Sequence, residues 1–320
     1  MRKALLLYNP ESGRRRQRRV EQVGAAAAAL GASGVETVVE VTREPGSAAA
    51  QVRAAIEAGC DAVIVCGGDG SVHEALPGIV GTPAALGVIP LGTGNGLAND
   101  LGLPRDPAAA ARLLAAARPR AITLPRIEYP VTSSERRSNH FMIGAGVGAD
   151  AQMVYALTLR IKQRWGMAAY YTESTRQWLT NSFPLFNVEF RDEQGRQRSE
   201  QVSQLLAIRI TWFGGLLRRL APGAALERDD FTLVLFKTRR RMRYLQYMIG
   251  VWQDRGGPVP DVEIVHSREV RCLPLEATDR QPAHRIYAEA DGELLGMLPV
   301  SLSMTAETVD LLVPSTAFRR

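Results

Sequence analysis

The sequence contains few of the residues from which covalent or metal-based frameworks are built. Its 320 residues include three cysteines and four histidines. The cysteines form no CxxC pair and are odd in number, so we expect neither a disulfide scaffold nor a cysteine-ligated zinc site. The histidines show no metal-ligand spacing such as HExxH, which argues against a zinc enzyme. Cys66 lies in an apolar run, and we interpret it as a small core residue.

Long hydrophobic runs are also lacking. No stretch approaches the roughly 18 apolar residues that a membrane span requires. The apolar run that follows Met1-Arg2-Lys3 is short, is interrupted by Asn9-Pro10 and has no small-residue cleavage site after it. We therefore interpret it as the first strand of a cytoplasmic protein rather than as a signal peptide.

Lysine is scarce, and arginine carries nearly all of the basic charge. Lys3, Lys162 and Lys237 are the only lysines among 39 basic residues, and the net charge is +6. A positive balance favours an acidic partner, and a nucleotide, a nucleic acid or an anionic membrane surface would each fit. Arginines cluster at 14–16, 18–19 and 239–241. Most runs of this kind are solvated surface.

The first third of the chain alternates strand and helix signals. Apolar runs predict strands at 4–8, 37–41, 62–66 and 86–89, and helical patterns extend to residue 30 and over 48–58 and 107–117. Strands that alternate with helices of about 10–15 residues predict an α/β domain with a doubly wound parallel sheet. In such sheets, ligands bind at the carboxyl ends of the strands.

From about Arg126 onward, short alternating segments bounded by turns replace this pattern. They predict strands at 185–190, 205–212, 231–236, 262–265, 286–290 and 300–304. Helical patterns remain at 152–179 and 241–252. Segments of this spacing predict a mainly antiparallel β-sandwich domain after the α/β domain, with a cleft between the two.

Polar loops that carry glycine follow three of the predicted strands in the first domain. They are Asn9-Pro10-Glu11-Ser12-Gly13, Gly67-Gly68-Asp69-Gly70-Ser71 and Gly92-Thr93-Gly94-Asn95-Gly96. Glycine lets backbone N–H groups approach phosphate oxygens, and a helix expected to begin near Val72 would add its N-terminus. The loops therefore predict one phosphate-binding edge, although neither a Walker P-loop nor a GxGxxG after the first strand is present. A carboxylate at Asp69 suits a divalent metal or a proton transfer, and the plainer alternative is a tight turn with a solvated aspartate.

At these residues the chain resembles the diacylglycerol kinase catalytic-domain family, which includes bacterial diacylglycerol kinases, YegS-like lipid kinases and sphingosine kinases. The matching elements are NPxSG at 9–13, Thr42, GGDG[ST]xxE at 67–74, PxGTxN at 90–95, a GFDA-like element at 148–151, a GxxxY-like element at 166–170 and Asp291-Gly292-Glu293. Their shared order spans nearly the whole chain. The resemblance implies an α/β ATP-binding domain over 1–125, completed by a returning segment at 305–320, and a β-sandwich substrate domain over 126–304.

The resemblance also implies an activity and a set of site residues. The activity is ATP- and Mg²⁺-dependent transfer of the γ-phosphate to the hydroxyl of a lipid such as diacylglycerol or a sphingoid base. Glu293 matches the proton acceptor of the diacylglycerol kinases, and Asp69 matches an aspartate with a base or metal role. Asp291 would assist through Mg²⁺, so Asp69 and Asp291 are the predicted metal ligands. The implied ATP contacts are Asn9, Pro10, Glu11, Ser12, Gly13, Thr42, Gly67, Gly68, Gly70, Ser71, Val72, His73, Glu74, Gly92, Thr93 and Asn95.

The chain departs from the family pattern at three positions that bear on substrate and metal. Gly96 stands where the family's GTxND carries its aspartate, and Ile143 stands where FxN carries asparagine. Arg228 replaces the aspartate of the LxDG segment, which helps build a structural metal site in some bacterial members. Because a guanidinium repels a cation, we expect no structural Mg²⁺ there. The identity of the acceptor lipid stays open.

Several alternative interpretations compete with this one. Asp-Gly at 291–292 is also a strong hairpin-turn signal, His73 suits helix capping or packing, and the aromatic stretch 155–178 suits a core as well as a lipid pocket. Relatives of NAD kinase or phosphofructokinase share a GGDG[ST] loop, and a non-catalytic nucleotide or lipid sensor would explain the departures.

We expect a lipid substrate at a membrane surface, with peripheral association during catalysis and no nucleic-acid partner. The oligomeric state is open, with a homodimer as one option.

Overall fold

The computed structural model describes residues 1–10, 18–132, 134–149, 151, 182–213, 219–253, 258–276 and 285–318. The chain forms two compact units. Unit 1 comprises Met1–Leu124, Trp212–Gly214 and Ala306–Arg320, and unit 2 comprises Pro125–Thr211 and Gly215–Thr305. Within the described residues, no helix combines the length and the apolar character needed to cross a membrane.

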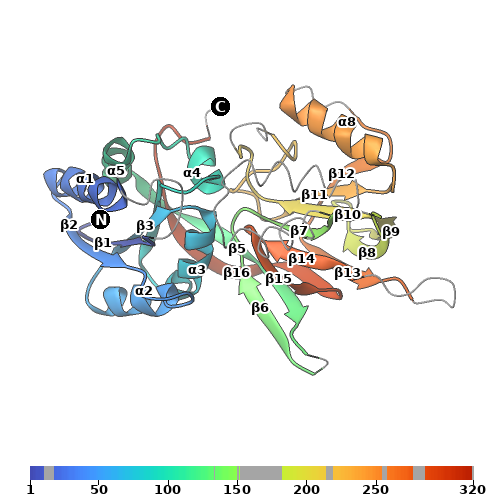
Figure 1. Ribbon diagram of the computed structural model, residues 1–320, viewed down its shortest axis with the longest axis horizontal. Coiled ribbons are helices and arrows are strands. Elements are labelled where there is room, and N and C mark those ends of the chain that lie inside the picture. Colours follow the sequence, from blue (N-terminus) through green and yellow to red (C-terminus); the bar gives the residue numbers. More distant parts are fainter. Residues whose placement is uncertain are drawn as a thin grey trace. The chain divides into compact units, whose positions relative to one another are not determined.

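Unit 1 is built on a parallel sheet with the strand order β2-β1-β3-β4 (Figure 1). The strands are β1 (Lys3–Tyr8), β2 (Glu36–Val41), β3 (Ala62–Gly67) and β4 (Ala85–Pro90). Strands β3 and β4 are buried along their whole length, as apolar runs without alternation predict for strands covered on both faces. The C-terminal part of β16 (Val300–Val313) continues this sheet, since Leu311 pairs in parallel with Leu86 of β4.

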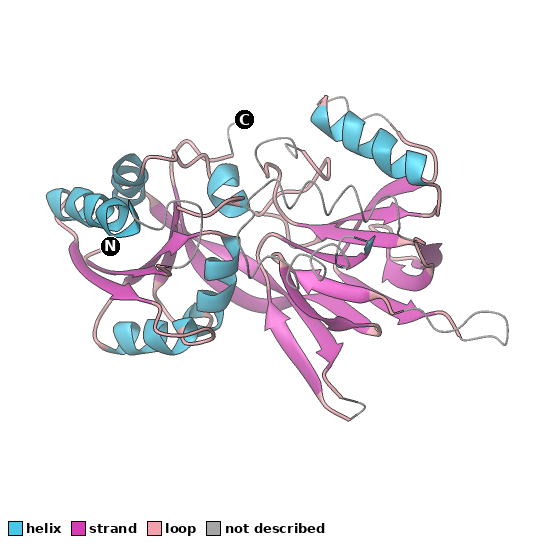
Figure 2. Ribbon diagram, viewed as in Figure 1, coloured by secondary structure: helices cyan, strands magenta, loops and turns pink. Residues whose placement is uncertain are grey.

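The helices of unit 1 follow the strands in alternation (Figure 2). They are α1 (Arg19–Ala32), α2 (Ala48–Glu57), α3 (Asp69–Ile79), α4 (Gly96–Asp100) and α5 (Pro107–Ala115). The α/β fold class predicted for this half of the chain is confirmed. One boundary is wrong: α3 begins at Asp69, and the sequence predicts a start near Val72. Glycine at position 70 disfavours a helix in isolation, but the N–H groups of Ser71 and Val72 both donate to the carbonyl of Gly68, which closes the first turn.

Unit 2 contains a six-stranded antiparallel sheet with the order β12-β11-β10-β7-β14-β15. Its strands are β7 (Gly144–Gly148), β10 (Gln204–Ile208), β11 (Phe231–Phe236), β12 (Val262–Ser267), β14 (Tyr287–Ala290) and β15 (Glu293–Met297). A second antiparallel layer consists of β13 (Glu269–Pro274), which pairs with β8 (Phe186–Arg191) and the first part of β16, and of β9 (Gln197–Val202), which pairs with β8. Helix α8 (Arg241–Trp252) follows β11.

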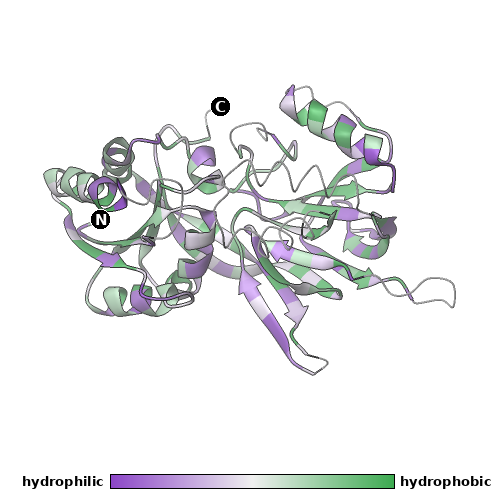
Figure 3. Ribbon diagram, in the orientation of Figure 1, coloured by the Kyte–Doolittle hydropathy of each residue, from purple (hydrophilic) through white to green (hydrophobic). Residues whose placement is uncertain are grey.

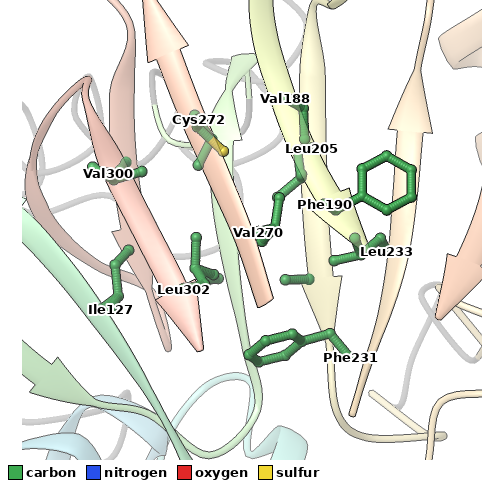
Figure 4. Close-up of a cluster of buried hydrophobic side chains, with 14 of the residues drawn as sticks. Ile127, Val188, Phe190, Leu205, Phe231, Leu233, Val270, Cys272, Val300 and Leu302 are labelled. Atoms are coloured by element: carbon green, nitrogen blue, oxygen red, sulfur yellow. The ribbon is translucent and has the colours of Figure 1, made fainter. Parts of the chain in front are cut away.

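The core of unit 2 lies between these two layers, as the prediction of a β-sandwich requires. Figure 4 shows side chains from both layers meeting in one buried cluster. From one layer come Val188, Phe190, Val270, Cys272, Val300 and Leu302, and from the other come Leu205, Phe231 and Leu233. Strand β5 (Arg118–Pro130) leads from unit 1 into unit 2, where its second half forms a hairpin with β6 (Arg136–His140).

Candidate functional site

The carboxyl ends of the parallel strands of unit 1 carry the polar turns that the sequence predicts as nucleotide-binding (Figure 1). Asn9 and Pro10 follow β1, Thr42 follows β2, Gly68 follows β3, and residues 91–95 follow β4. Because these strands are adjacent and parallel, their turns share one edge of the sheet. The N–H of Thr42 donates to the Tyr8 carbonyl at 2.8 Å, which extends the pairing of β1 and β2 up to the turns.

The two glycine loops touch each other at Gly68 and Gly92. A Cβ atom at position 92 would lie 2.4 Å from the Cα of Gly68 and 2.9 Å from its nitrogen, so only glycine fits there. The N–H groups of Leu91 and Gly92 donate to the Gly67 carbonyl at 3.0 and 3.2 Å. The backbones therefore meet with no side chain between them, as a loop pair that binds phosphate requires.

Asp69 connects the first loop to the second. Its Oδ2 accepts the N–H of Gly96 at 2.8 Å, and its Oδ1 accepts the N–H of Leu97 at 3.2 Å. Gly96 and Leu97 are the first residues of α4, where N–H groups lack partners within the helix and negative charge is favourable. The carboxylate at the start of α3 thus caps α4. Gly96, one of the departures from the family pattern, supplies one of the two donors.

Asn95 shapes the second loop through its own backbone and side chain. It has the left-handed conformation (φ 59°, ψ 45°), which asparagine adopts more readily than most residues. Its Oδ1 accepts the Gly92 N–H at 2.8 Å, and its Nδ2 donates to the Gly92 carbonyl at 2.9 Å. Both ends of the side-chain amide therefore hold the loop, and the predicted contact of Asn95 with a nucleotide stays a prediction.

Two residues for which the sequence predicts no contact with the site also hold this loop. Arg19 is only 1% exposed, and its Nη1 donates to the Leu91 carbonyl at 2.8 Å. Burial lowers the pKa of this guanidinium. Asn99 donates to the carbonyls of Gly94 at 3.0 Å and Phe213 at 2.7 Å. Arg19 belongs to an arginine cluster of the kind that is usually solvated surface, and Asn99 belongs to no motif.

The loop presents exposed backbone at its tip. Thr93 and Gly94 are exposed, and their N–H groups have no hydrogen-bond partner within the described ranges of the chain. The N-terminus of α3, which begins at Asp69, lies at the end of the neighbouring strand, and the N–H groups at a helix N-terminus favour an anion. Such a set of donors can bind the oxygens of a phosphate chain.

The remaining predicted ATP contacts of the GGDG[ST]xxE motif lie in the first two turns of α3. They are Gly70, Ser71, Val72, His73 and Glu74. His73 is 9% exposed. The Glu74 carboxylate accepts the N–H of Gly46, which has a φ of +83° in the turn after β2. Glu74 therefore fixes the backbone that follows Thr42.

In unit 2, Asp291-Gly292-Glu293 forms the turn of the β14–β15 hairpin. Asp291 and Gly292 both have positive φ, 50° and 85°, as a two-residue hairpin turn of the I′ type requires. Ala290 pairs with Glu293, the exposed first residue of β15. The hairpin interpretation is confirmed, and it leaves the predicted chemical role of Glu293 open because the two are compatible.

The Asp291 carboxylate is held by three backbone donors. Oδ1 accepts the N–H groups of Ile143 at 2.8 Å and Gly144 at 3.2 Å, and Oδ2 accepts that of Met142 at 2.9 Å. The N–H of Asp291 in turn donates to the Gly144 carbonyl at 2.9 Å. Asp291 therefore fixes the hairpin against the start of β7. Ile143, which departs from the family pattern, serves here through its backbone, with a side chain that is only 6% exposed.

Arg228 lies in an acidic environment in unit 2. Its Nε donates to Asp230 Oδ1 at 2.7 Å, and its Nη2 lies 3.6 Å from a Glu193 oxygen. Glu193, Asp230 and His266 have potential ligand atoms within 4.8 Å of one another. The guanidinium thus already supplies positive charge to these carboxylates. The expectation that no structural Mg²⁺ binds there stays a prediction.

Some of the predicted residues lie outside the described part of the chain. They are Glu11, Ser12 and Gly13 of the first turn, Asp150, and the helix predicted at 152–179 with its GxxxY element. Asp69 with the β3 and β4 loops belongs to unit 1, and Asp291 with Glu293 belongs to unit 2.

Comparison with known proteins is consistent with this architecture. Residues 3–127 match the family model of the diacylglycerol kinase catalytic domain, and residues 142–313 match that of the YegS C-terminal NAD kinase beta sandwich-like domain. The chain is 25% identical to a diacylglycerol kinase of Bacillus subtilis (strain 168) over 301 residues, which cover 93% of this chain and 92% of the relative.

Solved structures share the fold. A protein of Bacillus anthracis str. Sterne, provisionally named a diacylglycerol kinase, superposes with a TM-score of 0.74 at 17% identity and 98% coverage of both chains. Yeast NADH kinase in complex with NADH superposes with a TM-score of 0.52 at 11% identity, covering 98% of this chain and 84% of its own. The two family models, which match in chain order, show that this chain belongs to the diacylglycerol kinase catalytic-domain family, with a YegS-type β-sandwich-like C-terminal domain.

Proposed function

We propose that this protein is an ATP- and Mg²⁺-dependent lipid kinase that transfers a phosphoryl group to a lipid hydroxyl. The observation that carries the proposal is the linkage of the two glycine loops by Asp69. One carboxylate at the start of α3 caps α4, so the loops after β3 and β4 are held together as one edge. Family membership and the name of the B. subtilis relative support a kinase with a lipid acceptor.

On the nucleotide side, the backbone of unit 1 suits a phosphate chain. Thr93 and Gly94 are exposed in the loop after β4, and the N-terminus of α3 follows β3, so backbone donors of both loops lie at the same edge of the sheet. Gly68 and Gly92 leave no side chain between the loops. No P-loop lysine is present, so backbone donors would carry most of the recognition of the phosphates.

The carboxylates of unit 1 and unit 2 suit different roles. Mg²⁺ commonly binds through one or two carboxylates plus substrate phosphates, and when bound it would neutralise charge that develops on the phosphoryl oxygens. Asp69 would serve as such a ligand, because its carboxylate lies at the start of α3 and its Oδ2 is 3.4 Å from the position that a Cβ atom at Gly94 would take, beside the exposed tip of the second loop. Asp291 already accepts three N–H groups, so its first role is to position the hairpin that carries Glu293.

Glu293 would act as the proton acceptor. Its side chain begins β15 at the exposed end of the hairpin, where it can meet a lipid hydroxyl. Phosphoryl transfer passes through a loose transition state, so the hydroxyl needs no early deprotonation. A carboxylate can therefore orient the hydroxyl and accept its proton late in the reaction.

The test is phosphate transfer from labelled ATP with Mg²⁺ to mixed-micelle lipids. The panel contains diacylglycerol, a sphingoid base and phosphatidylglycerol, together with NAD because the chain shares a fold with yeast NADH kinase. Glu293→Gln should lower kcat by roughly 10²–10⁴-fold, the usual contribution of a positioned base, with an unchanged melting temperature.

The matched control for this variant is Glu307→Gln, a change of the same type at an exposed site elsewhere in the chain. Transfer to NAD alone would assign a small-molecule kinase, and ATP binding without transfer to any acceptor would assign a sensor. Either result would refute a lipid kinase.

A further inference from the structure

Helix α8 exposes an apolar face that its packing in unit 2 does not need. Five of the twelve exposed large hydrophobic side chains in the described part of the chain lie on this one helix. They are Met242 (56% exposed), Leu245 (38%), Met248 (38%), Ile249 (42%) and Trp252 (59%). At about 100° per residue, these positions span an arc of roughly 120° on one side of the helix. Figure 3 shows the green apolar bands of α8 between its purple ends.

The opposite side of α8 anchors it to the β-sandwich. The Tyr244 ring stacks on Phe236 with the ring centroids 4.4 Å apart, and the Tyr247 ring meets Phe236 edge-on at 5.2 Å. The hydroxyl of Tyr244 hydrogen-bonds with Ser203 at 2.6 Å, and the hydroxyl of Tyr247 donates to the Leu220 carbonyl. Helix α8 is therefore fixed to the β-sandwich through its tyrosine side, and its apolar face on the other side remains exposed.

Arginines surround the N-terminal end of the same helix. The stretch from Arg239 to Gln253 contains four arginines and no acidic residue. Cations at a helix N-terminus oppose the helix dipole, and α8 has neither an acidic residue in its first turn nor a side-chain cap. Helix stability therefore does not explain these arginines. Arg239, Arg240 and Arg241 are exposed, whereas Arg243 lies 3.6 Å from Asp261.

We propose that α8 docks this protein on an anionic phospholipid surface. An amphipathic helix with basic residues beside a face that contains Trp, Leu and Met is typical of helices that lie in a membrane interface. The exposed arginines would contact headgroup phosphates, and the apolar side chains would enter the boundary of the acyl chains. A second copy of α8 would match the apolar face but would offer no carboxylate to the arginines between 239 and 253. This inference rests on the proposed function, because a kinase whose substrate is embedded in lipid has to bind the lipid surface.

Vesicle sedimentation tests the proposal with the full chain. The vesicles are phosphatidylglycerol–phosphatidylcholine mixtures, with phosphatidylcholine alone for comparison. Wild-type protein should bind the anionic vesicles and release them in high salt. The variant Met242→Gln/Ile249→Gln/Trp252→Gln should bind at least about tenfold more weakly because less apolar surface is buried. Arg240→Gln/Arg241→Gln should weaken binding by about fivefold per arginine removed.

A matched control replaces apolar side chains of similar exposure in unit 1. Val20 is 69% exposed and Val41 is 41% exposed, and Val20→Gln/Val41→Gln should bind vesicles like the wild type. Equal binding by wild type and the α8 triple variant would overturn the proposal. The proposal would also be overturned if sedimentation equilibrium showed a wild-type dimer that the α8 triple variant loses while its vesicle binding stays unchanged. A second copy of the chain would then cover the apolar face of α8.

Kinase assays in detergent micelles separate this inference from the proposed function. The α8 variants should keep their turnover in micelles, because α8 contains none of the residues proposed to bind ATP or to act in catalysis. Turnover without α8-dependent vesicle binding would remove the docking inference alone. Binding that depends on α8 without transfer to any lipid would remove the kinase proposal and leave the docking surface standing.

Discussion

Replacing Asp69 by asparagine tests how unit 1 holds its two glycine loops. In the native protein each carboxylate oxygen accepts one backbone N–H, from Gly96 at 2.8 Å and from Leu97 at 3.2 Å. Asparagine keeps one acceptor oxygen, and its NH₂ group must then face the other N–H donor. The isosteric change therefore places two donors against each other at the start of α4.

The cost can be worked from these contacts. A hydrogen bond to a charged group contributes about 1.5–3 kcal/mol, and the bond that remains becomes a weaker neutral one. Loss of negative charge at the N-terminus of α4 removes roughly 0.3–1 kcal/mol more. Asp69→Asn should therefore lower the free energy of unfolding by about 2–4 kcal/mol. Surface substitutions usually change it by less than about 0.5 kcal/mol.

Urea unfolding followed by circular dichroism measures this effect as a lower midpoint with an unchanged slope. Asp106→Asn is the matched control, because Asp106 caps α5 through a single bond from the Ala109 N–H at 2.7 Å. One acceptor oxygen is enough there, and asparagine caps a helix about as well as aspartate. A midpoint for Asp69→Asn equal to those of the wild type and Asp106→Asn would refute the reasoning.

Two further changes have defined outcomes. Gly92→Ala places a Cβ atom 2.4 Å from the Gly68 Cα, so the melting temperature should fall by an amount that corresponds to about 1–3 kcal/mol. The control is Gly24→Ala in α1, where a Cβ atom meets open space, and this variant should have a higher melting temperature than the wild type. A hydrogen bond from Arg198 holds the pKa of Glu263 below its ordinary 4.5, so this pair stabilises the fold above that pH and loses its effect as pH falls through the lowered pKa. Glu263→Gln should flatten the decline of the urea midpoint between about pH 5 and pH 3, and an unchanged decline would contradict this.

Local patterns are enough to predict the elements whose character depends on nearby residues. The helix expected at 241–252 is α8 (Arg241–Trp252), and the strand expected at 62–66 is β3, longer by Gly67. Strand β7 is not among the predicted strands, because Gly-Ala-Gly-Val-Gly has little strand propensity. It forms because β10 and β14 pair on its two sides at close range. A Cβ atom at Gly148 would lie 2.5 Å from the Ser203 carbonyl oxygen.

The sequence by itself determined where strands end in glycine-bearing polar turns, because turn chemistry and apolar runs are local properties. Only the tertiary structure decided which groups the two central aspartates bind. Asp69 reaches amides 27 and 28 residues away, and Asp291 reaches amides up to 149 residues away. A carboxylate accepts from whichever donors the fold brings within about 3 Å, and no local pattern specifies them. The same folding turned Arg19 into a buried support of the second loop and left the apolar face of α8 exposed.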